Sequence, residues 1–381
     1  MRLAIFAATA LALALAACAS ASSTTTASTE TTPAMNAEDP YLWLEDVEGD
    51  RALTWVREQN ARSLPQLEND PRFPQLLADA TALANSRDRL PLGGIFDGYY
   101  YNFWQDEAHV RGIYRRARLT DFARNGNPTW ETVLDIDAIA TAENANWVFK
   151  GIDCLEDTTL CLVALSDGGK DATTYREYDM ATRRFVANGF VVPEAKSGVT
   201  WLDRNTLLVA TDWGPENGSA TMTDSGYPFV VKRWTRGTPL ASATELTRGQ
   251  SSDVGMFAGV LQDTDGTRIP IAVRATTFFE STNFRLDGAQ PQQINLPPKS
   301  SIAGVYQGYL IATLQEAWRG HPQGALIAYP LSETGSENPN VTVLFAPNPR
   351  QSIEGVSITH DAIIVAGYEN VRGRLLRIAR N

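Results

Sequence analysis

The sequence predicts a mainly β protein: a β-propeller, complete or incomplete, of about six to seven four-stranded blades, preceded by a short helical segment. Two observations predict this fold. Short apolar or alternating segments, separated by turn signals, run from Leu90 to the C-terminus. These segments recur with a period of about 50 residues, and four short strands in a repeat of that length are typical of a propeller blade.

The first 18 residues have the pattern of an export signal. A positive start at Met1-Arg2 precedes an apolar run that ends at Ala17. The run is too short for a membrane-spanning helix of about 20 residues. Because Leu15-Ala16-Ala17-Cys18 resembles the lipobox of bacterial lipoproteins, we expect cleavage before Cys18 and lipidation of its sulfur. Residues 19–38, rich in Ser, Thr and Ala, are then expected to form a disordered tether. This predicts a protein of the cell envelope or periplasm, lipid-anchored to a bacterial membrane. A plain signal peptide with an incidental cysteine is the alternative.

Residues 39–90 form the predicted helical segment. Asp50 is the expected N-cap of a helix over Arg51 to Arg62. Asp70-Pro71 then interrupts the helical pattern, because a residue before proline disfavours the helical conformation. A second helix is predicted over Gln75 to Ser86. Four of its residues are expected to face inward: Leu76, Leu77, Ala80 and Leu83.

Residues 91–381 form the predicted propeller. Four apolar residues occupy matching places in a repeated pattern of strand, tight turn and strand: Leu162, Leu208, Leu310 and Ile364, separated by 46, 102 and 54 residues. We expect no helix longer than one turn after Leu90. A pair of β-sandwiches is the alternative interpretation of such divergent repeats.

The composition excludes some functions. A formal net charge of −11 argues against nucleic-acid binding, which requires a basic surface. Only three histidines are present, and neither His109 nor His321 has a nucleophile signature nearby. His360-Asp361 fits a hairpin turn better than half of a catalytic triad. We therefore assign no catalytic residue.

No metal or other cofactor is predicted either. Asp263-Thr264-Asp265-Gly266 resembles the start of a calcium loop, but Arg274 stands where a later glutamate ligand is needed. The segment therefore reads as a hairpin turn between two strands.

Cysteine and tryptophan positions indicate structure rather than chemistry. Cys154 and Cys161 lie at the facing ends of a predicted hairpin, and an exported chain can keep a disulfide between them. Two buried thiols are the alternative. Seven tryptophans are expected to pack between blades rather than to form a ligand platform: Trp43, Trp55, Trp104, Trp147, Trp201, Trp213 and Trp234.

Two segments near the start carry a family resemblance. Asp39-Pro40-Tyr41-Leu42-Trp43-Leu44-Glu45-Asp46, followed by Trp55-Val56-Arg57-Glu58-Gln59-Asn60, resembles the opening of the prolyl oligopeptidase family of serine peptidases. Gly98-Tyr99-Tyr100-Tyr101, Val133-Leu134-Asp135 and Leu165-Ser166-Asp167-Gly168-Gly169-Lys170-Asp171 resemble its first blades. The resemblance implies an N-terminal helical segment, a seven-bladed propeller that admits only short peptides, and a C-terminal α/β-hydrolase domain carrying the catalytic serine, aspartate and histidine.

The chain departs from this family pattern in its second half. It contains no Gly-x-Ser-x-Gly sequence, shows no strand–helix alternation after Gly304, and ends in a strand pattern at Ile378 to Asn381. We therefore expect a truncated chain, the substrate-gating propeller portion of a peptidase, inactive alone. Its expected partners are a short peptide, a downstream hydrolase domain and a membrane, with no nucleic acid. The alternative is a stand-alone envelope propeller that binds a peptide, a glycan or a partner protein.

Overall fold

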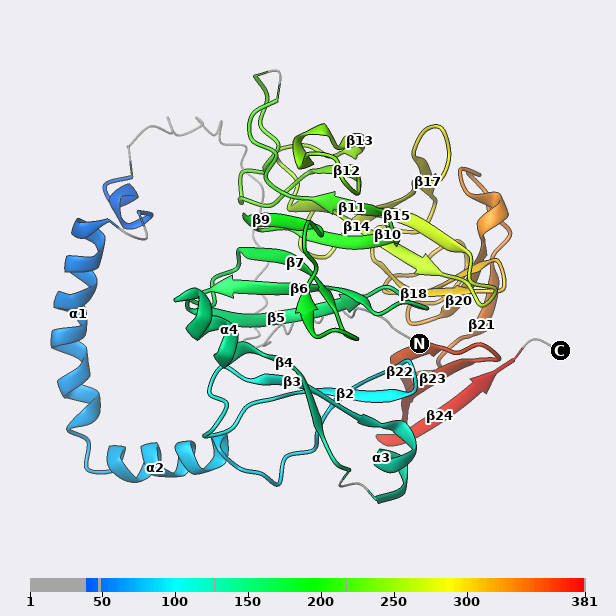
Figure 1. Ribbon diagram of the computed structural model, residues 1–381. Helices are drawn as coiled ribbons and strands as arrows, with labels where there is room; N and C mark the ends of the chain where they lie inside the picture. Colours follow the sequence, from blue (N-terminus) through cyan, green and yellow to red (C-terminus); the bar gives the residue numbers. More distant parts are fainter. Residues whose placement is uncertain (1–38, 47–48, 126–127, 217, 380–381) are drawn as a thin grey trace, which may run out of the picture. The chain divides into compact units, whose positions relative to one another are not determined.

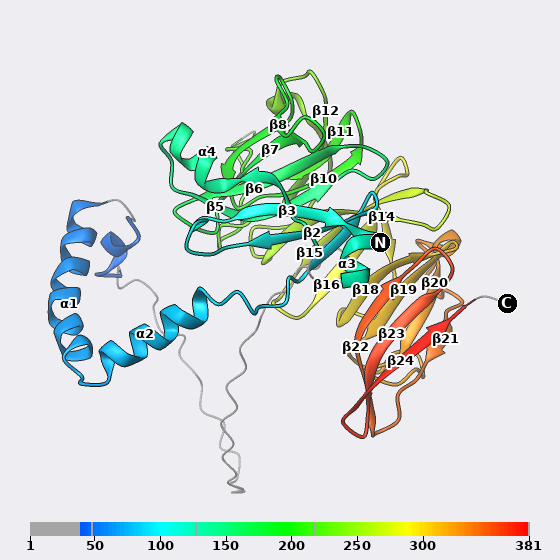
Figure 2. The same ribbon diagram turned by 60° about the horizontal axis from the view of Figure 1, so that its bottom comes forward.

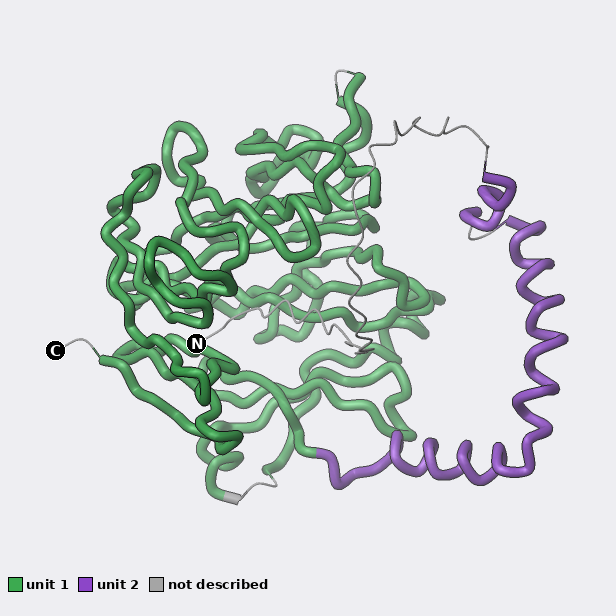
Figure 3. Tube along the Cα trace, turned by 180° about the vertical axis from the view of Figure 1, so that it is seen from behind, with its two compact units in different colours: residues 1–4, 90–381 green, residues 5–89 purple. Residues whose placement is uncertain are grey.

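The computed structural model describes residues 39–46, 49–125, 128–216 and 218–379. The predicted signal, the predicted lipidation site Cys18 and the predicted tether over residues 19–38 lie outside these ranges. The chain divides into two compact units at the boundary between Arg89 and Leu90 (Figure 3). We describe each unit by itself.

The first unit is helical. It contains a 3₁₀ turn, η1 (Leu42–Leu44), and two helices, α1 (Asp50–Glu68) and α2 (Phe73–Ala84). All four helix boundaries differ from the prediction, and α2 ends at Ala84 rather than at Ser86. Gly49, not Asp50, is the N-cap of α1, and α1 continues past Arg62. Helix α2 begins at Phe73, because Pro74 falls in its first turn, where a missing N–H breaks no helical hydrogen bond.

The predicted inward face of α2 is wrong within the described residues. Leu76, Leu77 and Leu83 are 61%, 55% and 75% exposed. The two helices run in clearly different directions (Figure 1), so neither covers the apolar stripe of the other. Ala52 is the one buried residue of the two helices. In the described ranges, no helix combines the length and the apolarity needed to cross a membrane.

The second unit is a ring of six antiparallel sheets, which we number one to six (Figure 1 and Figure 2). Sheet one contains β1 (Gly93–Phe96), β2 (Tyr99–Trp104), β3 (Ile113–Arg118) and β4 (Glu131–Asp135). Sheet two contains β5 (Trp147–Cys154), β6 (Leu160–Asp167), β7 (Thr173–Asp179), β8 (Arg184–Phe185) and β9 (Val191–Ala195). Sheet three contains β10 (Gly198–Asp203), β11 (Thr206–Ala210), β12 (Val230–Thr235) and β13 (Thr244–Arg248).

The remaining three sheets repeat the same plan. Sheet four contains β14 (Gly255–Gln262), β15 (Arg268–Ala275), β16 (Ser281–Arg285) and β17 (Gln292–Ile294). Sheet five contains β18 (Ser300–Tyr306), β19 (Tyr309–Leu314), β20 (Leu326–Pro330) and β21 (Thr342–Phe345). Sheet six contains β22 (Gln351–Ile358), β23 (Ile363–Glu369) and β24 (Arg372–Ile378), so three of its strands are described.

The strands follow the chain order within each sheet, except that both β8 and β9 pair with β7. The first strands of sheets two to six contact one another in succession. A separate apolar cluster fills each junction between consecutive sheets, from sheets one and two to sheets five and six. These contacts define a propeller of six sheets, which confirms the predicted fold.

The predicted repeats correspond to one strand of the blade. Leu162, Leu208, Leu310 and Ile364 lie in β6, β11, β19 and β23, the second strands of their sheets. The long separation of 102 residues spans sheet four, whose second strand is β15. The repeat of strand and turn therefore reflects a real equivalence between blades.

Two helices within the ring contradict the expectation that no helix longer than a turn follows Leu90. They are α3 (Leu119–Asn125) and α4 (Ile136–Glu143). The side chain of Asp135 caps α4 by accepting a hydrogen bond from the backbone nitrogen of Ala138. Asn144 ends the helix in the left-handed conformation, and Ile136 anchors it because its side chain is fully buried.

Candidate functional site

The ring has two distinct ends, which the chain topology defines. Each loop between a second and a third strand bonds to a segment that connects consecutive sheets. Examples are Gly168 N to Asn146 O at 2.8 Å and Gln315 N to Lys299 O at 2.8 Å. We call this end the connector face, and the end with the first hairpin turn of every sheet the turn face. The chain enters the ring at the start of β1, on the connector face.

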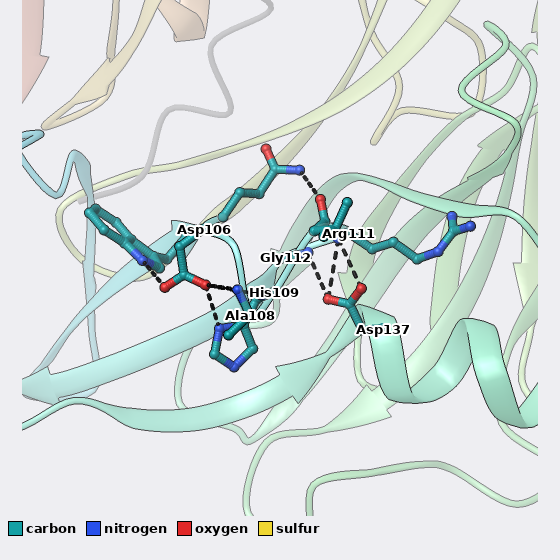
Figure 4. Close-up of polar contacts among 9 residues, drawn as sticks. Asp106, Ala108, His109, Arg111, Gly112 and Asp137 are labelled. Atoms are coloured by element: carbon teal, nitrogen blue, oxygen red, sulfur yellow. Dashed lines mark hydrogen bonds and ion pairs between the residues drawn. The ribbon is translucent and has the colours of Figure 1, made fainter. Parts of the chain in front are cut away.

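His109 lies on the connector face, in the loop between β2 and β3 (Figure 4). Its Nδ1 is 2.9 Å from Oδ1 of Asp106, which also accepts hydrogen bonds from the backbone nitrogens of Ala108 and His109. The indole nitrogen of Trp104 donates to the other carboxylate oxygen at 3.0 Å. Partial burial alone raises the pKa of Asp106, but these hydrogen bonds outweigh it and lower the pKa to about 2.

A second carboxylate fixes the same loop to α4. Asp137, in the first turn of α4, accepts hydrogen bonds from the backbone nitrogens of Arg111 and Gly112 (Figure 4). The loop between β2 and β3 is therefore held at both ends, and the charge of Asp106 serves its conformation. The His109 ring interacts with the carboxylate of Asp106, which is the pairing of a base with an orienting acid.

The two predicted turns that carry acidic residues meet on the turn face. Asp263 accepts hydrogen bonds from the backbone nitrogens of Gln307 and Gly308, both at 2.6 Å, and so ties sheet four to sheet five. The hydroxyl of Tyr306 donates to the carbonyl of Asp361, which ties sheet five to sheet six. A shallow depression lies between these turns, lined by Thr264, Asp265, Tyr306, Gln307, His360 and Asp361.

Neither turn builds a metal site in the described ranges, where no three His, Cys, Asp or Glu side chains are arranged to hold a metal ion. His360 and Asp361 contact each other at 2.8 Å in the turn between β22 and β23, and both side chains are about four-fifths exposed. His321 lies in the loop between β19 and β20, where its backbone bonds to that of Trp318. The structure therefore brings two sequence motifs together without forming a catalytic arrangement.

Cys154 and Cys161 are directly opposite each other in the pair formed by β5 and β6, and a disulfide joins them. Both are buried in the apolar cluster between sheets one and two. Trp201 and Trp234 are buried in the cluster between sheets two and three, as expected for packing between blades. The expectation is wrong for Trp43 and Trp55, which lie in the helical unit.

One repeat signal escaped the sequence analysis. Five of the six first strands carry a glycine followed by isoleucine or valine, two or three residues before the strand ends: Gly94-Ile95, Gly151-Ile152, Gly259-Val260, Gly304-Val305 and Gly355-Val356. At Gly304 the φ angle is +148°, and an added Cβ would lie 2.8 Å from Cδ1 of Ile358 in the next sheet. Close approach of the next sheet therefore favours glycine at position 304. At Gly94, Gly151 and Gly355 an added Cβ would meet no atom within 4 Å. The strand register shifts just before Gly151, Gly304 and Gly355, as at a β-bulge.

The ring of sheets, with its short repeats and closely packed first strands, defines this chain as a propeller domain. Residues 22–380 match the model for the prolyl oligopeptidase N-terminal β-propeller domain. The chain therefore belongs to the prolyl oligopeptidase family, and it corresponds to the propeller part of such peptidases.

Relatives place this propeller within longer proteins. The chain is 38% identical over 358 residues to the uncharacterized peptidase y4nA of Sinorhizobium fredii, covering 90% of this chain and 49% of that protein. A structure of a post-proline cleaving enzyme from Rickettsia typhi superposes with a TM-score of 0.80 at 25% identity, covering 89% of this chain and 51% of that one. Prolyl oligopeptidase B from Galerina marginata, at 15% identity and a TM-score of 0.65, shares the fold, with 90% of this chain and 49% of that chain covered. The chain thus spans about half the length of the proteins it matches.

Proposed function

We propose that this chain is the substrate-gating part of a serine peptidase that cleaves short peptides. One observation carries the proposal: the family match extends along the whole ring, while the chain covers 49% of a peptidase relative. The catalytic serine, histidine and aspartate belong, in this proposal, to an α/β-hydrolase domain outside the chain.

The proposed gating is steric. The first strands of sheets two to six contact one another in succession, so the ring leaves little room for a folded protein beside its axis. A short extended peptide is narrow enough to reach a catalytic centre that the ring covers. The ring would therefore select substrates by size, before any recognition of proline at the catalytic centre.

The helical unit supports the existence of a second domain. Apolar side chains are exposed on both helices, for example those of Leu67, Leu76 and Leu83, which are 61–75% exposed. A helix with an apolar stripe is stable when that stripe is buried against another element. In this proposal the stripe packs against the hydrolase domain.

A chimera tests the gating. It joins residues 39–381 of this chain to the remaining half of the Sinorhizobium fredii peptidase. We expect serine-dependent cleavage of a short fluorogenic prolyl peptide, and no cleavage of the same sequence placed in a surface loop of a folded protein. Replacing the catalytic serine of the added half is the control that assigns the turnover. Equal cleavage of peptide and protein would contradict gating by the ring.

We also propose that the protein is anchored in the cell envelope through a lipid on Cys18. The lipobox-like sequence Leu15-Ala16-Ala17-Cys18 supports this, and the disulfide between Cys154 and Cys161 suits an oxidising compartment. Bacteria that express the full chain should incorporate labelled palmitate into it and retain it in the membrane fraction. The Cys18→Ser variant should lose both properties. Unlabelled wild-type protein in the soluble fraction would refute the anchor.

A further inference from the structure

Lys196 differs from the other lysines of the chain in its partner. Three of the five lysines pair with a glutamate, and Lys150 donates to the carbonyl of Gly169 at 3.0 Å. The ammonium of Lys196 instead lies over the ring of Tyr227, 4.4 Å from its centre. The nearest carboxylate in the sequence, Glu194, is engaged by another lysine, and among the described residues no carboxylate pairs with Lys196. A half-buried ammonium on an aromatic face, without a carboxylate partner, is suited to bind an anionic ligand.

The loop that carries Tyr227 is closed by hydrogen bonds. Tyr227 lies between β11 and β12, on the connector face. The backbone nitrogen of Thr223 donates to the carbonyl of Tyr227 at 2.7 Å, and the hydroxyl of Thr223 accepts from the backbone nitrogen of Tyr227 at 3.1 Å. The backbone nitrogen of Asp224 donates to the carbonyl of Ser251, in the segment that connects sheets three and four. The ring beneath the ammonium therefore has a fixed position.

A second aromatic ring lies against Tyr227. Phe257 belongs to β14, the first strand of sheet four, and its ring meets that of Tyr227 edge to face with centroids 6.3 Å apart. The first strands of sheets three and four begin with glycine, Gly198 in β10 and Gly255 in β14. A Cβ added at either position would lie within 3.6 Å of the Phe257 ring. Neither strand therefore covers this ring with a side chain of its first residue.

We propose that Lys196, Tyr227 and Phe257 form a carboxylate cradle, a specificity-determining site that binds the carboxylate of a short peptide. The Lys196 ammonium donates charge-assisted hydrogen bonds to the carboxylate oxygens. The two rings pack against the apolar part of the residue that carries the carboxylate. The carboxylate cradle rests on the proposed function, because that function supplies a short peptide as the ligand.

The charges of the chain favour a carboxylate over a larger anion. A formal net charge of −11 repels nucleic acid and anionic lipid surfaces. One lysine is a single point charge, which matches a carboxylate, whereas phosphate groups are typically held by arginine forks or by several backbone N–H groups. Every short peptide with a free C-terminus carries such a carboxylate, but an internal segment of a folded protein has none on its backbone. The carboxylate cradle therefore selects short peptides in the same direction as the proposed gating by size.

Peptide binding tests the carboxylate cradle without turnover. The chimera described above, with its catalytic serine replaced by alanine, is titrated into two dye-labelled prolyl peptides that differ only in a C-terminal acid or amide. Fluorescence anisotropy gives the two dissociation constants. We expect the acid to bind about tenfold more tightly, as for one charge-assisted hydrogen bond. Lys196→Met should bind both peptides with the weaker constant, whereas Lys196→Arg should keep the preference because it keeps the charge.

Arg350→Met is the matched control, because Arg350 is exposed on the connector face between sheets five and six and its loss removes the same charge. The preference for the acid should be unchanged in this variant.

A third peptide, amidated and ending in aspartate, locates the carboxylate. If it binds as tightly as the acid, the carboxylate cradle takes an acidic side chain; if it binds as weakly as the amide, the carboxylate cradle takes the C-terminus. Equal constants for acid and amide in the unsubstituted chimera, or no binding of any peptide, would overturn the carboxylate cradle. Restoring the serine separates the two proposals. Cleavage without a preference in binding refutes the carboxylate cradle alone, and a preference in binding without cleavage refutes the peptidase function alone.

Discussion

Replacing Trp201 with alanine should lower the free energy of unfolding by about 3–5 kcal/mol. Its side chain is 1% exposed, in the apolar cluster that joins sheets two and three. Its indole nitrogen donates to the carbonyl of Asp153 at 3.1 Å, and Phe190 packs edge to face on its ring at 5.8 Å. The substitution leaves a cavity and removes this hydrogen bond. Chemical denaturation of the purified chain, followed by circular dichroism, measures the loss.

Trp55→Ala is the matched control, because Trp55 lies in α1 and is 42% exposed. We expect a loss of about 0.5–1.5 kcal/mol for that variant, because its ring makes an edge-to-face contact with Trp43. Similar losses for both variants would show that Trp201 does not stabilise the junction between sheets two and three.

Replacing Arg236 with alanine should have an effect of similar size, about 3–5 kcal/mol, for an electrostatic reason. Its guanidinium donates two hydrogen bonds, at 2.8 and 2.9 Å, to the carboxylate of Glu177. Glu177 is 1% exposed and belongs to sheet two, whereas Arg236 follows the third strand of sheet three. Without Arg236, the buried carboxylate keeps the backbone nitrogen of Phe190 as its remaining donor. Denaturant unfolding at neutral pH measures the difference.

Arg233→Ala provides the control, since Arg233 lies on the same strand, β12, and is exposed. Both variants lose one positive charge, so the comparison isolates the buried pair from the net charge of the chain. We expect a change within about 0.5 kcal/mol for the control. Equal stabilities of the two variants would refute the role of the Glu177–Arg236 pair.

The propeller could be predicted from the sequence because the second strand of each blade is buried on both faces of its sheet. Such strands are unbroken apolar runs in the sequence, as around Leu208 and Leu310. A turn precedes each of these runs at a similar position in the repeat. The second strand of sheet four was not matched to this repeat, because Pro270 and Arg274 interrupt its apolar run. The repeated glycine of the first strands marks sheet four at Gly259 and was available in the sequence.

Other features depend on contacts that no local pattern contains. Helix α4 has eight residues, too few for a clear helical period, and its signals are the caps at Asp135 and Asn144. The apolar stripe of α2 correctly indicated a helix. A stripe does not show which surface covers it, and in the described residues Leu76, Leu77 and Leu83 stay exposed. The ion pair between Glu177 and Arg236 joins residues 59 positions apart, so only the packing of two sheets reveals it.

Peptide hydrolysis by the purified chain tests the central claim most directly. If the chain is a propeller that gates a catalytic centre supplied by another domain, a fluorogenic prolyl peptide should remain intact at every concentration of the chain. Turnover that copurifies with the chain and disappears on treatment with a serine-directed reagent would show a catalytic centre within these 381 residues and would contradict the account.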